Sequence, residues 1–158
     1  IRRLDAGEGE KVPFLHEVIE MVDGQAAINI ELKGPGTAQP TSALLDAWCL
    51  EHRADPNQFL LSSFNHRELA LASPRYARGA LFWKMPGDAI ERALSLDARY
   101  MNMAFKHVTE AWVNAAHTAG LKVAVYTVNE IDDIQRMSRW GVDAIFCDYP
   151  DRGFQALE

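Results

Sequence analysis

Apolar and polar positions follow two different periods along the chain, that of strands and that of helices, and segments of the two kinds alternate. Short apolar runs, some with every second residue polar, are typical of strands. Six such runs predict strands over residues 26–33, 59–64, 77–83, 99–105, 122–128 and 144–147. Apolar residues at helical spacing predict helices over residues 12–22 with Pro13 in the first turn, from a cap at Thr41 or Ser42 through Leu50, and over 67–73, 87–96, 109–119 and 131–140.

Six strand–helix units follow one another without a linker or a low-complexity segment, which indicates one α/β domain over residues 1–158. A doubly wound sheet accepts six strands, whereas a (β/α)8 barrel has eight. The first strand–helix turn has no glycine-rich phosphate-binding fingerprint, which weakens the nucleotide-binding interpretation. Polar residues at strand carboxyl ends, such as Glu31, Thr127 and Asp148, favour a barrel of the TIM type, incomplete in this chain.

The first predicted strand carries Asn29, Glu31 and Lys33 on one face, because strand side chains alternate between the two faces. Burying charge is costly unless the charge is paired or binds a metal. This strand therefore suits a sheet whose apolar face is covered by helices and whose polar tip lines a site. A structural Glu31–Lys33 pair at a strand end is the alternative interpretation of the same pattern.

Composition excludes several classes of function. The 158 residues are 48% hydrophobic and carry a net charge of −6, which argues against a nucleic-acid partner. No apolar run approaches the length of a membrane span. Cys49 and Cys147 lie far apart and form no metal or redox motif, so we expect a reducing compartment. We predict a cytoplasmic location and do not exclude the periplasm.

Several collinear segments together resemble the glycerophosphodiester phosphodiesterase family. The resemblance runs from about residue 12 to residue 151, and its strength lies in the order of the segments. The segments are Val12-Pro13-Phe14-Leu15, Ile28-Asn29-Ile30-Glu31-Leu32-Lys33, Ser62-Ser63-Phe64-Asn65-His66, Val125-Tyr126-Thr127-Val128-Asn129 and Gly141-Val142-Asp143-Ala144-Ile145-Phe146-Cys147-Asp148-Tyr149-Pro150.

The resemblance implies a TIM-barrel hydrolase that cleaves glycerophosphodiesters to glycerol 3-phosphate and an alcohol. It also implies a divalent cation, calcium or magnesium, held among carboxylates, with two histidines as acid and base. Glu31 inherits the role of a metal ligand, and Lys33 inherits a catalytic place beside the phosphate. Tyr126 stands where the family usually has a tryptophan that lines the substrate pocket. Hard cations prefer carboxylate oxygens, so this assignment is chemically consistent.

The family's early motifs are missing from this sequence. It contains no His-Arg-Gly, no His-Asp pair and no Glu-x-Asp on an apolar strand. We therefore expect the six strands to be barrel strands three to eight. We also expect the chain to be inactive without the catalytic histidines and the remaining metal carboxylates.

Further residues are candidates for the pocket. Trp83 ends a strand and is predicted to bind substrate, as is Ser63, since no base lies beside Ser62 or Ser63 to make either a nucleophile. His66 and His107 follow strand ends, where a structural role competes with a place at the barrel mouth. Asp148 either is structural or orients Lys33. We expect Asn129 to cap the helix that follows it.

A second hypothesis is a non-catalytic module that uses barrel elements to bind a ligand or a partner chain. An incomplete barrel leaves two open sheet edges, and open edges invite pairing. This hypothesis predicts a homo-oligomer that covers the strands around Ile30 and Ile145.

Overall fold

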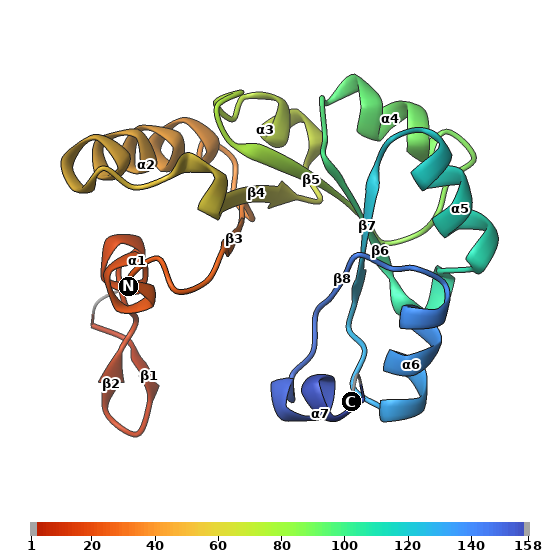
Figure 1. The fold of residues 1–158 in the computed structure, drawn as a ribbon. Coiled ribbons are helices and arrows are strands. Elements are labelled where there is room, and N and C mark those ends of the chain that lie inside the picture. The colour runs from red at the N-terminus through yellow and green to blue at the C-terminus, as the bar shows by residue number, and fades with distance from the viewer. Residues whose placement is uncertain (1–2, 157–158) are drawn as a thin grey trace.

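The computed structural model describes residues 3–156. Its main feature is a curled parallel sheet of six strands, joined in chain order with helices between them (Figure 1). The strands of this sheet are β3 (Ile28–Glu31), β4 (Phe59–Ser63), β5 (Ala77–Phe82), β6 (Tyr100–Ala104), β7 (Lys122–Tyr126) and β8 (Ala144–Ile145). The helices are α1 (Leu15–Val22), α2 (Ala38–His52), α3 (His66–Ala70), α4 (Ala89–Ser95), α5 (Glu110–Thr118), α6 (Ile131–Arg139) and α7 (Pro150–Gln155), with 3₁₀ turns η1 (Pro56–Gln58) and η2 (Phe105–His107).

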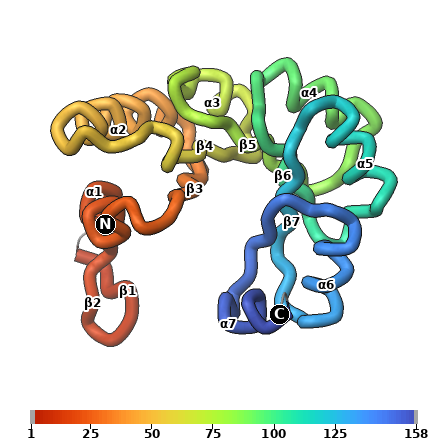
Figure 2. The backbone as a smooth tube through the Cα atoms, in the orientation of Figure 1, coloured from red at the N-terminus to blue at the C-terminus, as the bar shows by residue number. Residues whose placement is uncertain are grey.

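The strand order decides between the two folds that the sequence left open. The order β3-β4-β5-β6-β7-β8 follows the chain without reversal. A doubly wound sheet would reverse its order at a switch point, so the sheet is of the barrel type. The prediction of an incomplete TIM-type barrel is thus confirmed, and the backbone trace shows an arc whose two ends do not meet (Figure 2).

Side-chain alternation separates the two faces of this sheet. Leu61, Met101 and Val123 project to the convex side and are fully buried, and helices α2 to α6 lie along that side (Figure 1). On the concave side the parallel register sets Glu31 beside Ser62, so both project to the same face. The convex face therefore carries the core, and the concave face carries the polar side chains.

The start of α2 differs from the prediction. The helix begins at Ala38, and Ser42 lies inside it, donating its hydroxyl hydrogen bond to the Ala38 carbonyl. The cap comes from another helix: the Glu68 carboxylate accepts the Ala38 amide at 2.7 Å and the Gly36 amide at 3.0 Å. These bonds hold the pKa of Glu68 below its ordinary value. A local pattern could not reveal a cap that lies 30 residues away.

Smaller differences lie at the termini of the elements. Helix α1 begins at Leu15, so Pro13 lies before it rather than in its first turn. An antiparallel hairpin, β1 (Asp5–Gly7) and β2 (Glu10–Lys11), precedes α1, and both of its strands are exposed, so the hydrophobic pattern does not predict it. None of the helices within residues 3–156 has the length and apolar character needed to cross a membrane.

Candidate active site at the carboxyl ends of the strands

Glu31 is the last residue of β3, and the sheet fixes its direction. The Leu32 amide donates to the Ser62 carbonyl at 2.7 Å, which extends the pairing of β3 with β4 past Glu31. Leu32 itself is buried on the convex side. The Glu31 side chain therefore projects to the concave side, where it is 32% exposed.

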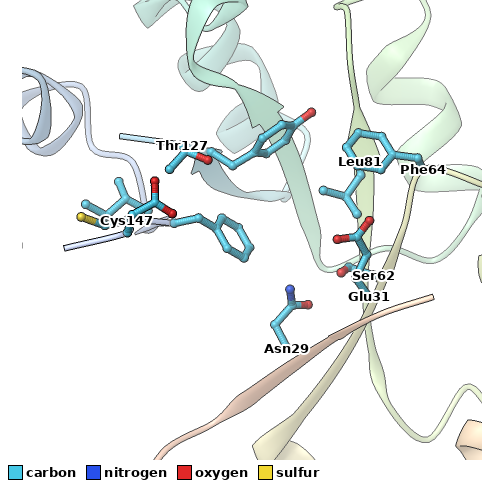
Figure 3. A pocket seen from close by; sticks show the side chains of 11 residues that line it. Asn29, Glu31, Ser62, Phe64, Leu81, Thr127 and Cys147 are labelled. Atoms are coloured by element: carbon cyan, nitrogen blue, oxygen red, sulfur yellow. The ribbon is translucent and has the colours of Figure 1, made fainter. Parts of the chain in front are cut away.

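Glu31 borders a polar pocket of about 530 Å³. Asn29, Glu31 and Ser62 approach it from β3 and β4, and Thr127 and Cys147 face them from the segments that follow β7 and β8 (Figure 3). The remaining wall is completed by Phe64, Leu81, Tyr126, Ile145, Phe146 and Asp148. Carboxylate, amide and hydroxyl oxygens thus converge where a barrel-type fold builds its active site.

A second pocket, of about 720 Å³, adjoins the first. The two share four wall residues, Glu31, Phe64, Tyr126 and Thr127. Lys33 lines the second pocket, and its ammonium lies 3.7 Å from a Glu31 carboxylate oxygen. The sequence prediction that Glu31 and Lys33 share one face is confirmed, and the pair stands at the boundary between the two pockets.

Tyr126 forms a rigid part of this boundary. Its hydroxyl donates to the Phe82 carbonyl at 2.6 Å, across from β7 to β5. Burial and the nearby Glu31 carboxylate raise the pKa of Tyr126 to about 12. The phenol is therefore protonated at neutral pH, and its hydrogen bond holds the ring on the pocket wall.

Two serines at the end of β4 have different environments. Ser63 is fully buried; its hydroxyl donates to the Leu32 carbonyl at 2.6 Å and accepts the Asn65 amide at 3.0 Å. It thus lies beneath the pockets and holds the two strand ends together. Ser62 instead lines the first pocket, and no described residue hydrogen-bonds its buried hydroxyl.

Trp83 lies where the sequence placed it, at the end of β5 on the wall of the second pocket. Its indole stacks on Phe64 with a centroid distance of 4.2 Å, and 66% of the residue is exposed. The motif analysis assigned no role to Phe64. The sequence could have indicated Phe64 as a pocket residue, because strand alternation directs it to the same face as Ser62.

The histidines do not reach either pocket wall. His66 is half-buried at the start of α3, where its Nε2 lies 3.0 Å from the Leu81 carbonyl, which agrees with a structural role. His107 lies in η2. All five histidines of the chain lie within residues 3–156, and none is among the residues that line these two pockets.

Asn129 does not cap α6, so that prediction is wrong. Glu130 occupies the cap position, and the Asn129 amide group bonds Asp148 twice: Nδ2 donates to the carboxylate at 2.8 Å, and Oδ1 accepts the Asp148 amide at 2.9 Å. This exchange ties the segment after β7 to the segment after β8. Asp148 therefore takes the structural role that the sequence left open for it.

The wall of the first pocket carries some of the oxygen ligands that a divalent cation needs. The first pocket is lined by Glu31, Asp148 and Asn29, whose side chains carry oxygens, and hard cations prefer oxygen ligands. Within residues 3–156, no three histidine, cysteine, aspartate or glutamate side chains gather as a metal cluster would. The described residues therefore offer carboxylate oxygens that fit part of a cation site, and they do not form a complete one.

Comparison with known proteins gives a consistent result. Residues 1–152 match the model of the glycerophosphoryl diester phosphodiesterase family. A glycerophosphodiester phosphodiesterase from Caldanaerobacter subterraneus subsp. tengcongensis is 28% identical, over 96% of this chain and 67% of its own length. One from Bacillus altitudinis is 30% identical, over 93% of this chain and 63% of its own length.

Solved structures give the same picture. A phosphodiesterase from Oleispira antarctica, in complex with the product sn-glycerol-3-phosphate, superposes with a TM-score of 0.84 at 29% identity, covering 95% of this chain and 63% of that one. A protein from Galdieria sulphuraria gives 0.84 at 26% identity, covering 99% and 68%. The chain thus spans about two thirds of the length of these relatives.

Proposed function

Because the chain belongs to the glycerophosphoryl diester phosphodiesterase family, we propose that it forms part of an enzyme that hydrolyses glycerophosphodiesters to glycerol 3-phosphate and an alcohol. One observation carries the proposal: the Glu31–Lys33 pair lies at the carboxyl end of β3, on the wall of adjoining pockets. A purely structural ion pair does not require pockets beside it.

In this proposal Glu31 is the ligand that this chain provides to a calcium or magnesium ion. The oxygen-rich wall of the first pocket supports that role. When bound, such an ion stabilises negative charge on the phosphoryl oxygens. Lys33 keeps its ammonium 3.7 Å from Glu31 and is 79% exposed, so it can turn toward a phosphate in the same space.

The other wall residues bind and orient the diester. Tyr126 is held by its bond to the Phe82 carbonyl and presents a fixed ring to the substrate. Ser62 lies beside the first pocket, but its hydroxyl is fully buried and has no hydrogen-bond partner among the described residues, so we assign it no contact with the substrate. Trp83 is proposed to bind substrate in the second pocket, whereas Ser63 supports the wall by fixing Leu32.

We further propose that β3 to β8 are strands three to eight of a barrel, and that residues outside this chain provide the acid and base. Two observations support this: β3 and β8 each pair with a single described strand, and the relatives are about half as long again as the chain. None of the chain's histidines lines the two pockets, which agrees with an acid and a base that come from outside this chain.

One observation favours the alternative of a non-catalytic module. The open edges of β3 and β8 can pair with another chain, and such pairing would give a homo-oligomer. In that case the pockets would bind ligand without turnover. The oligomeric state and the activity of the same sample therefore separate the two proposals.

The test is hydrolysis of glycerophosphocholine by the full-length natural protein, with calcium and with magnesium. Glu31→Gln is expected to lower kcat/KM by about 100-fold or more, because it removes a carboxylate from the charge-stabilising site. Glu51→Gln, an exposed substitution on α2, is the matched control and leaves activity unchanged. Both variants should unfold within about 0.5 kcal/mol of the parent. Full activity in Glu31→Gln, or no hydrolysis by the parent with either ion, would reject the enzymatic proposal.

A further inference from the structure

Three aromatic rings form a corner on the wall of the second pocket. Phe64 and Trp83 lie parallel, with centroids 4.2 Å apart and an interplanar angle of 13°. Tyr126 stands across Phe64 at 5.8 Å and 88°. We call these three residues the aromatic corner; they come from the ends of β4, β5 and β7, so three separate strands fix it.

The corner is preorganised by contacts outside the rings. The Tyr126 hydroxyl donates a hydrogen bond to the Phe82 carbonyl. Phe82 is buried, and it directly precedes Trp83 in the chain. Phe64 precedes Asn65, whose side chain accepts the Glu68 amide and caps α3. A ligand that meets these rings would therefore not have to order them first.

The two adjoining pockets differ in their chemistry. Asn29, Ser62 and Asp148 line the first and not the second. The second adds the Trp83 ring, and its polar side chains beyond Glu31 and Lys33 are Asn65 and Thr127. A phosphodiester centred at Glu31 and Lys33 would extend one half into each pocket.

We propose that the polar pocket receives the glycerol phosphate half of the diester and that the aromatic corner receives the alcohol half, with a preference for a quaternary ammonium alcohol of the choline type. This inference rests on the proposed function and goes beyond it by naming the substrate class. Ring faces attract cations that shed water easily, and quaternary ammonium groups are the best examples.

Other alcohols fit the corner less well. A polyol or a primary ammonium needs several hydrogen-bond partners when it leaves water, and apart from the Glu31–Lys33 pair this pocket offers the side chains of Asn65 and Thr127. A hydrocarbon alcohol can bury apolar surface against the same rings, but it gains no attraction between a cation and the ring faces. The opposite charges of Glu31 and Lys33 offset each other, so the ring faces set the preference for a cationic alcohol.

The experiment compares three substrates of the full-length protein that differ only in the alcohol. They are glycerophosphocholine, glycerophosphoethanolamine and the 3,3-dimethylbutyl diester, which has the shape of choline without its charge. The parent should prefer the choline diester over both by about three- to tenfold in KM, the size of a partly exposed cation–π contact. Trp83→Ala should raise KM for the choline diester by a similar factor and change KM for ethanolamine less than about twofold.

Phe154→Ala serves as the control, because Phe154 is an exposed aromatic residue that lines neither pocket. Equal KM values for the choline and dimethylbutyl diesters would overturn the cation preference, and an equal loss for all three diesters in Trp83→Ala would overturn the specificity role. If no diester is hydrolysed, the proposed function fails, and saturation-transfer NMR with choline alone decides the inference: choline signals that weaken in Trp83→Ala support it, and no binding to the parent rejects it.

Discussion

The convex and concave faces of the sheet are built from the same strands and serve different purposes. Leu61 and Val125 on the convex face are fully buried in the apolar core. One residue along from each, Ser62 and Tyr126 line the first pocket. The difference shows that a single step along a strand moves a side chain from the core to the pocket wall, because the side-chain period is two. Substitutions at neighbouring positions can therefore test the comparison directly.

The largest effect is expected at Leu61. Leu61→Ala should lower the free energy of unfolding by about 2–5 kcal/mol, since it leaves a cavity among buried side chains. Ser62→Ala, one residue along, should cost less than about 1 kcal/mol, because its hydroxyl makes no hydrogen bond with a described residue. Urea denaturation of both variants measures the difference, and equal losses would contradict the division of the two faces.

The sequence predicted this division well where the signal was local. Alternation in β3 identified Glu31 and Lys33 on the polar face, and the same alternation could have identified Phe64. Motif resemblance added Tyr126, whose place on the pocket wall agrees with it. These residues could be predicted because their direction depends on the strand period alone.

Contacts between distant segments could not be predicted in this way. The α2 cap comes from Glu68 on α3, so Thr41 and Ser42 were better local candidates than the true partner. Asn129 was expected to cap α6 and instead binds Asp148 from the next strand. The Glu68 and Asn129 side chains can each hydrogen-bond to a nearby or to a distant partner, and the tertiary fold decides which partner is within reach.

A middle-sized effect is expected at Gly79, on the concave face. An added Cβ would lie 3.2 Å from both the Asn102 amide nitrogen and the Ser62 Cβ, closer than ordinary contact. Gly79→Ala should therefore cost about 1–3 kcal/mol through overpacking. Gly87→Ala is the matched control, because nothing lies within 4 Å of its added Cβ. Thermal or urea unfolding measures both, and a stable Gly79→Ala would mean that the concave face is more loosely packed than the convex face.

The smallest effect is expected at Glu68, which caps α2 beyond the carboxyl end of β3, and it depends on pH. The Ala38 and Gly36 amides lower the pKa of Glu68 below 4.5. A carboxyl whose pKa is lower in the folded state stabilises the fold above its unfolded value, and this contribution is lost as pH falls through the folded value. The parent should therefore lose more stability than Glu68→Gln as pH falls below about 4.5.

The control for this prediction is Glu51→Gln, whose exposed side chain lies on the surface of α2. It should keep the pH slope of the parent, since its carboxylate is exposed, whereas two backbone amides bond the carboxylate of Glu68. Urea midpoints at neutral pH and at about pH 3 give the slopes. Parallel slopes for the parent and Glu68→Gln would mean that the carboxylate's charge adds nothing to the α2 cap, and that a neutral acceptor is enough to hold the loop that joins Lys33 to α2.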